Sequence, residues 1–309
     1  GMRNVEDQTT SITQVPNELA RQGFLPIDEV SNCTDVRPDG LCFVGVDPIV
    51  APYLDLYPLP TGRDKGDGSG EWNQVFNRTE GEKYFLGKVD HNFSDSDSFF
   101  TRYTFQEGSQ IVPGSFQLMD LDNRTRNQYV TIEEKHIFSP TLLNVVRVGF
   151  NRSRLAATDI VNDPRFEDPS LAYEPGKPHI GDLRLGSPFS NLGRSYNRPR
   201  VRVLNTFEYS DNVSYTKDRH SLKFGVKYQR YQNNHEQANN HRGSYTFRGL
   251  QDFMENKPYR YNGARVGADD YVRGDRHHIP ALFIQEDLQV RSNLTLNLGL
   301  RWEAATPNR

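Results

Sequence analysis

The chain has 309 residues, a formal net charge of −3 and a pI near 6.3. This length suits one large domain or two ordinary ones. Lysines and arginines are scattered rather than clustered, so the charge gives no reason to expect a nucleic-acid partner. No run of about 18 apolar residues occurs, which excludes a membrane-spanning helix.

The two ends of the chain carry no signal of their own. Residues Gly1–Asp7 lack the basic and then apolar pattern of a secretion signal, and Arg309 follows closely on a predicted strand. We therefore expect the chain to be a piece of a longer protein.

Residues 1–78 show little regular periodicity, apart from one or two helical turns over 15–22. Glycine, proline and aspartate are frequent, which predicts a long loop-like segment with few regular elements. Cys33 and Cys42 are the only cysteines. Their spacing favours a loop disulfide in an oxidising compartment, with a pair of free thiols as the alternative. A zinc site is less favoured, because no second cysteine pair lies nearby.

From residue 84 onward the sequence predicts paired strands joined by short turns rich in Ser, Asp, Asn and Pro. The predicted hairpins pair 84–93 with 98–106, 129–138 with 141–151, 203–215 with 221–231, and 281–290 with 294–303. The stretches between hairpins are far longer than the usual connection of about 4–6 residues. Strands that run up and down would place all the turns at one end and all the long loops at the other. That asymmetry is typical of an outer-membrane β-barrel.

Period-two alternation gives these strands one apolar and one polar face. The alternation is cleanest over 294–303, where leucines and a tryptophan alternate with polar residues or glycine, and over 222–229. A soluble sandwich is one interpretation of such strands. A membrane barrel is favoured by their length, close to the ~9–11 residues that cross a bilayer at a tilt.

The barrel interpretation assigns a role to each face. Aromatic side chains near the ends of the apolar stripes are expected at the membrane interfaces, namely Tyr215, Tyr228 and Trp302. Polar side chains of the alternate positions are expected to line the lumen, namely Arg147, Asn151, Lys223, Lys227, Gln229, Arg301 and Glu303. Two acids, Asp211 and Glu286, interrupt apolar faces. Either a bulge turns each acid away, or those faces are not wholly in contact with lipid.

Stretches 107–127, 153–202 and 232–279 are expected to be long extracellular loops, in which function is often found. Their tyrosines can stack on sugars or peptides, although packing within the loops is the more ordinary role for each one. The tyrosines considered are Tyr173, Tyr196, Tyr259, Tyr261 and Tyr271.

Catalytic and metal-binding patterns are weak, so we expect neither an enzyme nor a cofactor. His277 and His278 are adjacent in a predicted strand and therefore point to opposite faces, which disfavours a shared metal ion. The same argument separates Glu133 from Glu134. No Gly-x-Ser-x-Gly motif exposes a nucleophile, and Asp120 begins only a fragment of a calcium loop.

Several segments resemble repeated hairpins of TonB-dependent receptors that carry an amino-terminal carboxypeptidase-regulatory-like domain. They are 84–93 with 99–103, 220–225, 283–288, and above all Leu294–Glu303 followed by Pro307; 15–24 is similar to a loop that precedes such hairpins. The resemblance covers most of the chain, and the order of the segments makes it more specific than each motif alone.

The resemblance implies that this chain is a middle portion of a 22-stranded barrel with its loops. The whole protein would be filled by a plug domain and would engage a TonB-type energy transducer through a part that this chain lacks. Its partners would be outer-membrane lipid, the plug, the transducer and an unidentified nutrient, and its loops would be extracellular. The alternatives are a soluble all-β module that binds glycans or mediates adhesion and, least favoured, a secreted β hydrolase.

Overall fold

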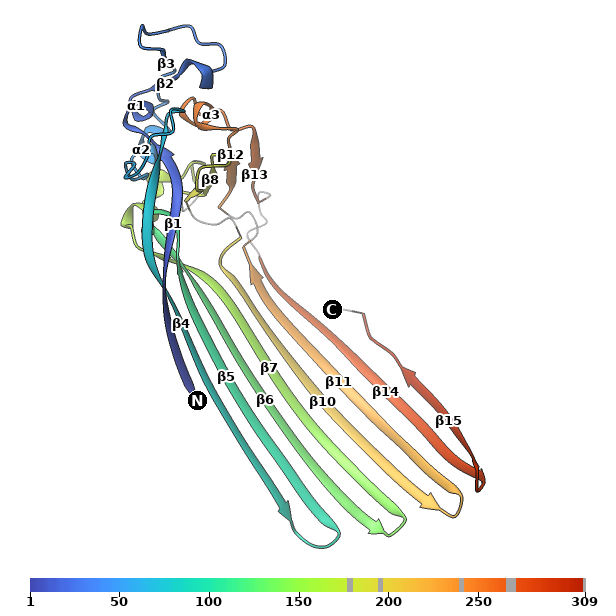
Figure 1. The fold of residues 1–309 in the computed structure, drawn as a ribbon. Helices are drawn as coiled ribbons and strands as arrows, with labels where there is room; N and C mark the ends of the chain where they lie inside the picture. The colour runs from blue at the N-terminus through green and yellow to red at the C-terminus, as the bar shows by residue number, and fades with distance from the viewer. Residues whose placement is uncertain (177–179, 194–196, 239–241, 265–270, 308–309) are drawn as a thin grey trace.

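The computed structural model describes residues 1–176, 180–193, 197–238, 242–264 and 271–307. Its main feature is a nine-stranded antiparallel sheet in the order β1-β4-β5-β6-β7-β10-β11-β14-β15 (Figure 1). The strands are β1 (Met2–Pro16), β4 (Ser69–Asn92), β5 (Asp97–Pro113), β6 (Met119–Ser139), β7 (Leu142–Val161), β10 (Arg200–Lys217), β11 (His220–Gln237), β14 (Val272–Arg291) and β15 (Leu294–Glu303).

Neighbouring strands of the large sheet follow one another along the chain, so the fold is an up-and-down meander. The four predicted hairpins correspond to β4–β5, β6–β7, β10–β11 and β14–β15, each antiparallel. Short turns join the strands at one end of the sheet and long connections lie at the other end (Figure 1). The predicted fold class, all-β with antiparallel strands of a barrel wall, is confirmed.

The strands extend well beyond the predicted ones, which corrects the expected loops. Residues 1–78, expected to hold few regular elements, contain all of β1 and the start of β4, paired from Met2↔Lys83 to Pro16↔Ser69. The loops expected at 107–127, 153–202 and 232–279 shrink to 114–118, 162–199 and 238–271. In the parts of these strands nearer the long connections, polar residues occur on both faces, so backbone pairing holds the strands without the regular hydrophobic alternation that marks a strand in sequence.

The long connections fold together into a small unit, here called the loop cap: the described residues of 17–68, 114–118, 162–199 and 238–271. Its helical elements are α1 (Glu18–Arg21), η1 (Ile27–Glu29), α2 (Ala51–Leu54), η2 (Ser115–Gln117), η3 (Pro164–Glu167), η4 (Pro169–Leu171) and α3 (Leu250–Met254). Its strands are β2 (Phe24–Pro26), β3 (Leu41–Phe43), β8 (Asp182–Arg184), β9 (Leu192–Gly193), β12 (Ser244–Thr246) and β13 (Arg260–Asn262). They form one sheet in the order β13-β12-β8-β9 and a β2–β3 ladder. Among the described residues, no helix has both the length and the apolar character needed to span a bilayer.

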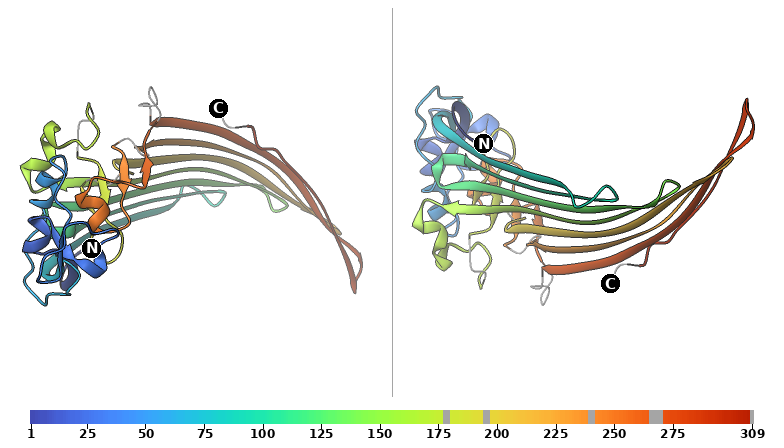
Figure 2. Two further views of the ribbon diagram at one scale, coloured as in Figure 1. Left: turned by 90° about the horizontal axis from the view of Figure 1, so that it is seen from above. Right: turned by 90° about the horizontal axis from the view of Figure 1, so that it is seen from below.

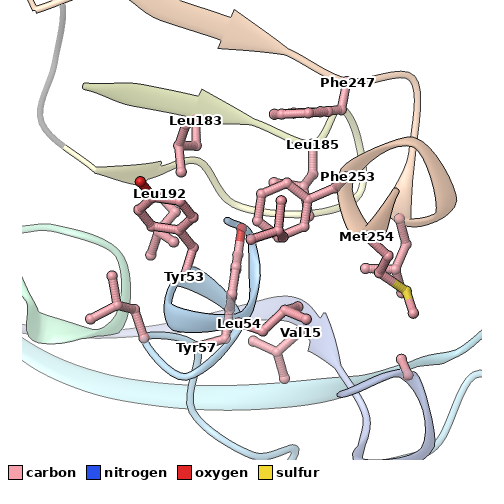
Figure 3. Close-up of a cluster of buried hydrophobic side chains, with 14 of the residues drawn as sticks. Val15, Tyr53, Leu54, Tyr57, Leu183, Leu185, Leu192, Phe247, Phe253 and Met254 are labelled. Carbon is pink, nitrogen blue, oxygen red and sulfur yellow. The ribbon is translucent and has the colours of Figure 1, made fainter. Parts of the chain in front are cut away.

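A hydrophobic core lies inside the loop cap rather than under the large sheet. Side chains from all four connections meet there, together with Val15 at the end of β1. Figure 3 shows Val15 with side chains of three of these connections. Tyr57, Phe166 and Phe253 are at most 2% exposed. Separate loops therefore share one interior, and burial of their apolar side chains stabilises the cap as a unit.

The large sheet is curved and open (Figure 2). β1 and β15 each pair with a single neighbour, so both edges present unpaired backbone groups within the described chain. A closed barrel removes such edges by pairing them with further strands. The arc therefore has the form of one part of a barrel wall.

Candidate functional site

One face of the large sheet carries a continuous apolar band near the turns. On the last hairpin, Leu282, Ile284 and Leu288 of β14 lie opposite Trp302, Leu300 and Leu296 of β15. The pairing continues strand by strand across the sheet, through the ladders that join β14 to β4. The apolar side chains of β4 to β15 thus share a single face, although a few polar side chains interrupt it near the turns.

Side chains of the apolar band are exposed in the isolated chain. Leu296 and Phe224 are each 43% exposed, Val148 is 37% exposed and Leu300 is 72% exposed. No second layer covers these side chains within the described residues. A soluble sandwich would bury them, so this exposure fits a face that meets lipid.

Aromatic side chains form a row on the same face at the edge of the band farther from the turns. The row comprises Phe85, Phe105, Phe150, Tyr209, Tyr228 and Trp302. Two of the predicted interfacial residues, Tyr228 and Trp302, lie in this row. Tyr215 lies on the same face near the β10–β11 turn. All three predicted residues thus share the apolar face, where their interfacial role remains a prediction.

The two acids on the apolar face stay there, since no register shift occurs beside them. Asp211 lies opposite Val226, and Glu286 lies opposite Leu298. Each acid has a polar partner on a neighbouring strand: Asn144 donates to Asp211, and His220 lies 2.5 Å from Glu286 through Nδ1. Of the two explanations offered by the sequence, the bulge is wrong. Local hydrogen bonding satisfies these carboxylates instead.

All seven residues predicted to line the lumen share the opposite face of the sheet. Several of them form hydrogen bonds or ion pairs on that face. Arg147 donates to Glu133, with 2.8 Å between Nε and Oε2. Lys227 and Gln229 both reach Glu208, at 3.0 and 2.8 Å. Such a face requires water or another polar surface beside it.

Polar-face residues near the loop cap line two shallow hollows. The first has a volume of about 340 Å³ and lies beside Glu80, Gln106 and Asn123. The second, of about 420 Å³, includes Arg200 and Arg202. Hydrogen bonds among Gln110, Glu80 and Asn123 leave amide and carboxylate groups in place for a polar ligand or a packed domain.

The adjacent histidines lie as their spacing implies. The His277 ring stacks on Tyr231 on the polar face, with 4.6 Å between ring centroids. His278 lies 2.5 Å from the Tyr228 hydroxyl on the apolar face. Nearer the turns, Asp97, Glu134 and His136 offer oxygen and nitrogen atoms within 4.8 Å of one another. Asp97 is hydrogen-bonded to His136 and Ser94, so its carboxylate already has polar partners.

A pocket of about 410 Å³ lies between the β5–β6 connection and β8–β9 of the loop cap. Its charged lining comes from Asp120, Asp182, Arg184 and Arg198. Arg184 donates to Asp182 at 2.8 Å. Because ion pairs already balance much of this charge, the pocket suits a ligand with hydrogen-bonding groups and an apolar part.

Burial changes the acid–base behaviour of the cap. Burial raises the pKa of Asp182, and the guanidinium of Arg184 opposes this rise without cancelling it. Burial also raises the pKa of Tyr53 to about 12. Tyr53 therefore stays neutral and donates a hydrogen bond to the carbonyl oxygen of Leu171 at 3.1 Å.

The loop tyrosines divide between packing and exposure. Tyr173 packs in the cap against Tyr53 and Tyr245. Tyr259 and Tyr261 are 54% and 50% exposed. Tyr261 donates to Glu174 at 2.7 Å. Tyr196 lies outside the described residues, and Tyr271 begins the segment that leads into β14.

Two links hold the cap together, and the sequence points to only one of them. Cys33 and Cys42 are joined by a disulfide that braces the β2–β3 ladder. Asp159 on β7 accepts hydrogen bonds from Arg198 and Arg242, at 2.7 and 2.9 Å. Cysteine spacing points to the first link. No sequence signal points to the second, because its partners come from different loops.

The whole chain, residues 1–309, matches the family model described as outer membrane beta barrel domain. A comparison with curated proteins finds no match. Among solved structures, the outer membrane transporter YddB from Escherichia coli is similar, with a TM-score of 0.50 and 12% sequence identity. The similarity covers 78% of this chain and 29% of that transporter, so the likeness shows the fold alone and this chain spans under a third of it. With an apolar band on one face and a full-length family match, the chain belongs to the outer membrane beta barrel domain family.

Proposed function

We propose that this chain is part of the wall and the ligand-capturing cap of a TonB-dependent outer-membrane transporter. The single observation that carries the proposal is the pocket of the loop cap, built at the end of a wall with one apolar and one polar face. A cap with its own core holds that pocket in place while a ligand binds.

The proposed mechanism is uptake without bond chemistry. A nutrient binds at the cap, and energy from a TonB-type transducer displaces a plug that rests against the polar face. The hollows beside Glu80 and Arg202 supply hydrogen-bonding groups for that plug or for the passing nutrient. The chain's resemblance to receptors with a carboxypeptidase-regulatory-like domain supports this assignment. A soluble glycan-binding module is disfavoured by the exposed apolar band.

Orientation is the first test, since the proposal requires an extracellular cap and periplasmic turns. Lys257 in the cap is exposed, with a side-chain exposure of 67%, and Asp95 lies in the β4–β5 turn. In intact cells, Lys257→Cys of the full-length protein should react with an impermeant maleimide, and Asp95→Cys should react only after permeabilisation. Labelling of Asp95→Cys alone in intact cells would contradict the proposed orientation.

Uptake is the second test. A knockout strain is screened for growth on candidate nutrients and complemented with the full-length protein. Asn191 lines the cap pocket, so Asn191→Trp should fill it. The concentration of the cognate nutrient that is required for growth should then rise at least tenfold. Lys257→Trp, outside the pocket, is the control. Uptake that continues without the proton-motive force would reject the TonB-dependent mechanism.

A further inference from the structure

Four arginines of β6 and β7 lie on the apolar face beyond the band, toward the loop cap. Along β7, Phe150 of the aromatic row is followed on the same face by Arg152 and Arg154. The facing positions on β6 include Arg126, which lies directly opposite Arg154, and Arg124 follows it on that face. These side chains, Arg124, Arg126, Arg152 and Arg154, are called the arginine quartet.

Internal partners compensate the quartet only in part. Glu107 accepts from Arg126 and Asp122 accepts from Arg124, at 2.5 and 2.9 Å. Arg152 donates to the neutral amide of Asn205. Among the described residues, Arg154 has no acid within 4.0 Å. Like charges directly opposite each other on neighbouring strands are destabilising, so the Arg126–Arg154 pair lowers stability unless an anion lies between them.

The position of the arginine quartet along the strands indicates which anion would lie between Arg126 and Arg154. Aromatic side chains mark the boundary of the hydrocarbon, and lipid headgroups begin directly beyond it. The quartet begins at the next position of the same face after Phe150. On the polar face, the corresponding positions of β6 and β7 hold Thr125, Asn127, Ser153 and Leu155, none of them charged. On β6 and β7 the arginines thus lie on the face and at the height expected for headgroups, whereas Arg200 and Arg202 of the polar face belong to β10.

We propose that the arginine quartet binds phosphate groups on lipids of the outer leaflet. Planar guanidinium groups match phosphate oxygens in bidentate geometry, which an exposed lysine cannot do. The side chains of Arg126 and Arg124 are 53% and 63% exposed, so they can reach a headgroup. The choice of the outer leaflet rests on the proposed extracellular orientation of the cap. The binding of phosphate by the quartet does not depend on that orientation.

The test measures lipid binding to the full-length protein in detergent micelles by native mass spectrometry. The probe is lipid A with its two phosphates, compared with dephosphorylated lipid A and with phosphatidylglycerol. Arg126→Gln with Arg154→Gln should weaken binding of phosphorylated lipid A about tenfold or more, because two cations that attract the phosphates are lost. Dephosphorylated lipid A should bind the wild type as weakly as the variant binds the phosphorylated form.

A matched control comes from the polar face. Lys88 on β4 lies directly opposite Arg102 on β5, so it is also a cross-strand pair of like charges. Lys88→Gln with Arg102→Gln should leave lipid binding unchanged. Equal loss in both double variants, or equal binding of the two forms of lipid A, would overturn the proposal. Stronger binding of phosphatidylglycerol would reject the outer-leaflet lipid.

Stability gives a second readout that a merely structural role would not produce. In bilayers without anionic lipid, the Arg126/Arg154 variant should unfold at a higher temperature than the wild type, because the repulsion is relieved. In bilayers with phosphorylated lipid A, it should unfold at a lower temperature. The same sign in both bilayers would contradict the proposal. Loss of uptake with unchanged lipid binding would reject only the proposed transport function.

Discussion

Asp159 near the end of β7 accepts a hydrogen bond from Arg242, with 2.9 Å between Oδ2 and Nη1. The two residues are 83 positions apart in the sequence. Their side chains are 1% and 6% exposed. Arg198 reaches the other carboxylate oxygen of Asp159. One buried acid on the wall thus ties two loops of the cap to the large sheet.

Replacing this acid should release the cap. Asp159→Asn leaves two guanidinium groups without their carboxylate in a buried site, and breaking such a pair costs about 3–5 kcal/mol. Segments 162–199 and 238–271 should then exchange their amide hydrogens faster, while the β10–β11 ladder keeps its protection. Hydrogen exchange with mass spectrometry on the full-length protein measures both.

An exposed ion pair is the control for this change. Lys88 lies 2.9 Å from Asp90, and their side chains are 51% and 62% exposed. Asp90→Asn should therefore cost no more than about 1 kcal/mol. Unchanged exchange in the cap of Asp159→Asn would show that the link does not hold the loops.

A charge on the apolar face should be more harmful than the same charge on the polar face. Leu300 lies opposite Ile284 on the apolar face, and Asn297 lies opposite Asp287 on the polar face. Leu300→Lys should destabilise the folded barrel by about 2–4 kcal/mol if that position is near the middle of the bilayer. Asn297→Lys should be neutral or slightly stabilising, because Asp287 faces the new cation. Urea unfolding of the full-length protein in lipid vesicles compares the two, and equal costs would refute the lipid-facing assignment.

The sequence predicts the part of the wall nearest the turns and misses most of the rest. Over 294–303 and 222–229, lipid on one side and water on the other impose alternation, which a single sequence displays directly. In β1 and the part of β4 paired with it, polar residues occur on both faces without a regular alternation, and pairing such as Thr10↔Val75 depends on the partner strand. Register of this kind is set by long-range pairing, which no local pattern encodes.

The candidate site shows the same division. Side chains predicted for the polar face, such as Lys227 and Arg301, follow from period two alone. The cap pocket joins Phe166, Leu192 and Arg198 to the β5–β6 connection. These contacts require several loops to fold together, and each loop alone has the composition of an irregular segment. The shared core of the cap is therefore a property of the tertiary fold.

The disulfide should brace one corner of the cap and leave the wall unaffected. Cys33 and Cys42 close a short loop across β2–β3, for which the chain-entropy model gives about 2–3 kcal/mol. Cys33→Ser with Cys42→Ser should increase proteolysis within 24–43 of the full-length protein. The heat-resistant electrophoretic mobility of the folded barrel should stay as in the wild type. Loss of that mobility would show that the disulfide is needed for the wall as well.

Asp182 should contribute more to the stability of the cap in mild acid than at neutral pH. Burial raises the pKa of Asp182 above its ordinary value, so the folded protein binds the proton more tightly than the unfolded chain. The contribution of this group to stability is therefore largest below the unfolded pKa. It falls as the pH rises through the unfolded and then the folded pKa, and it stays low at neutral pH.

The contribution of Asp163 to stability should change with pH in the opposite direction, which provides an internal comparison. A hydrogen bond from Arg165 lowers the pKa of Asp163, so its contribution is present above the unfolded pKa and is lost as the pH falls. The stability of the wild-type cap relative to Asp182→Asn should therefore decrease from pH 3 to pH 7, and relative to Asp163→Asn it should increase. Amide exchange of the cap, followed at several pH values and corrected for intrinsic rates, measures both differences. The same sign for both variants would mean that the burial of Asp182 does not govern its protonation.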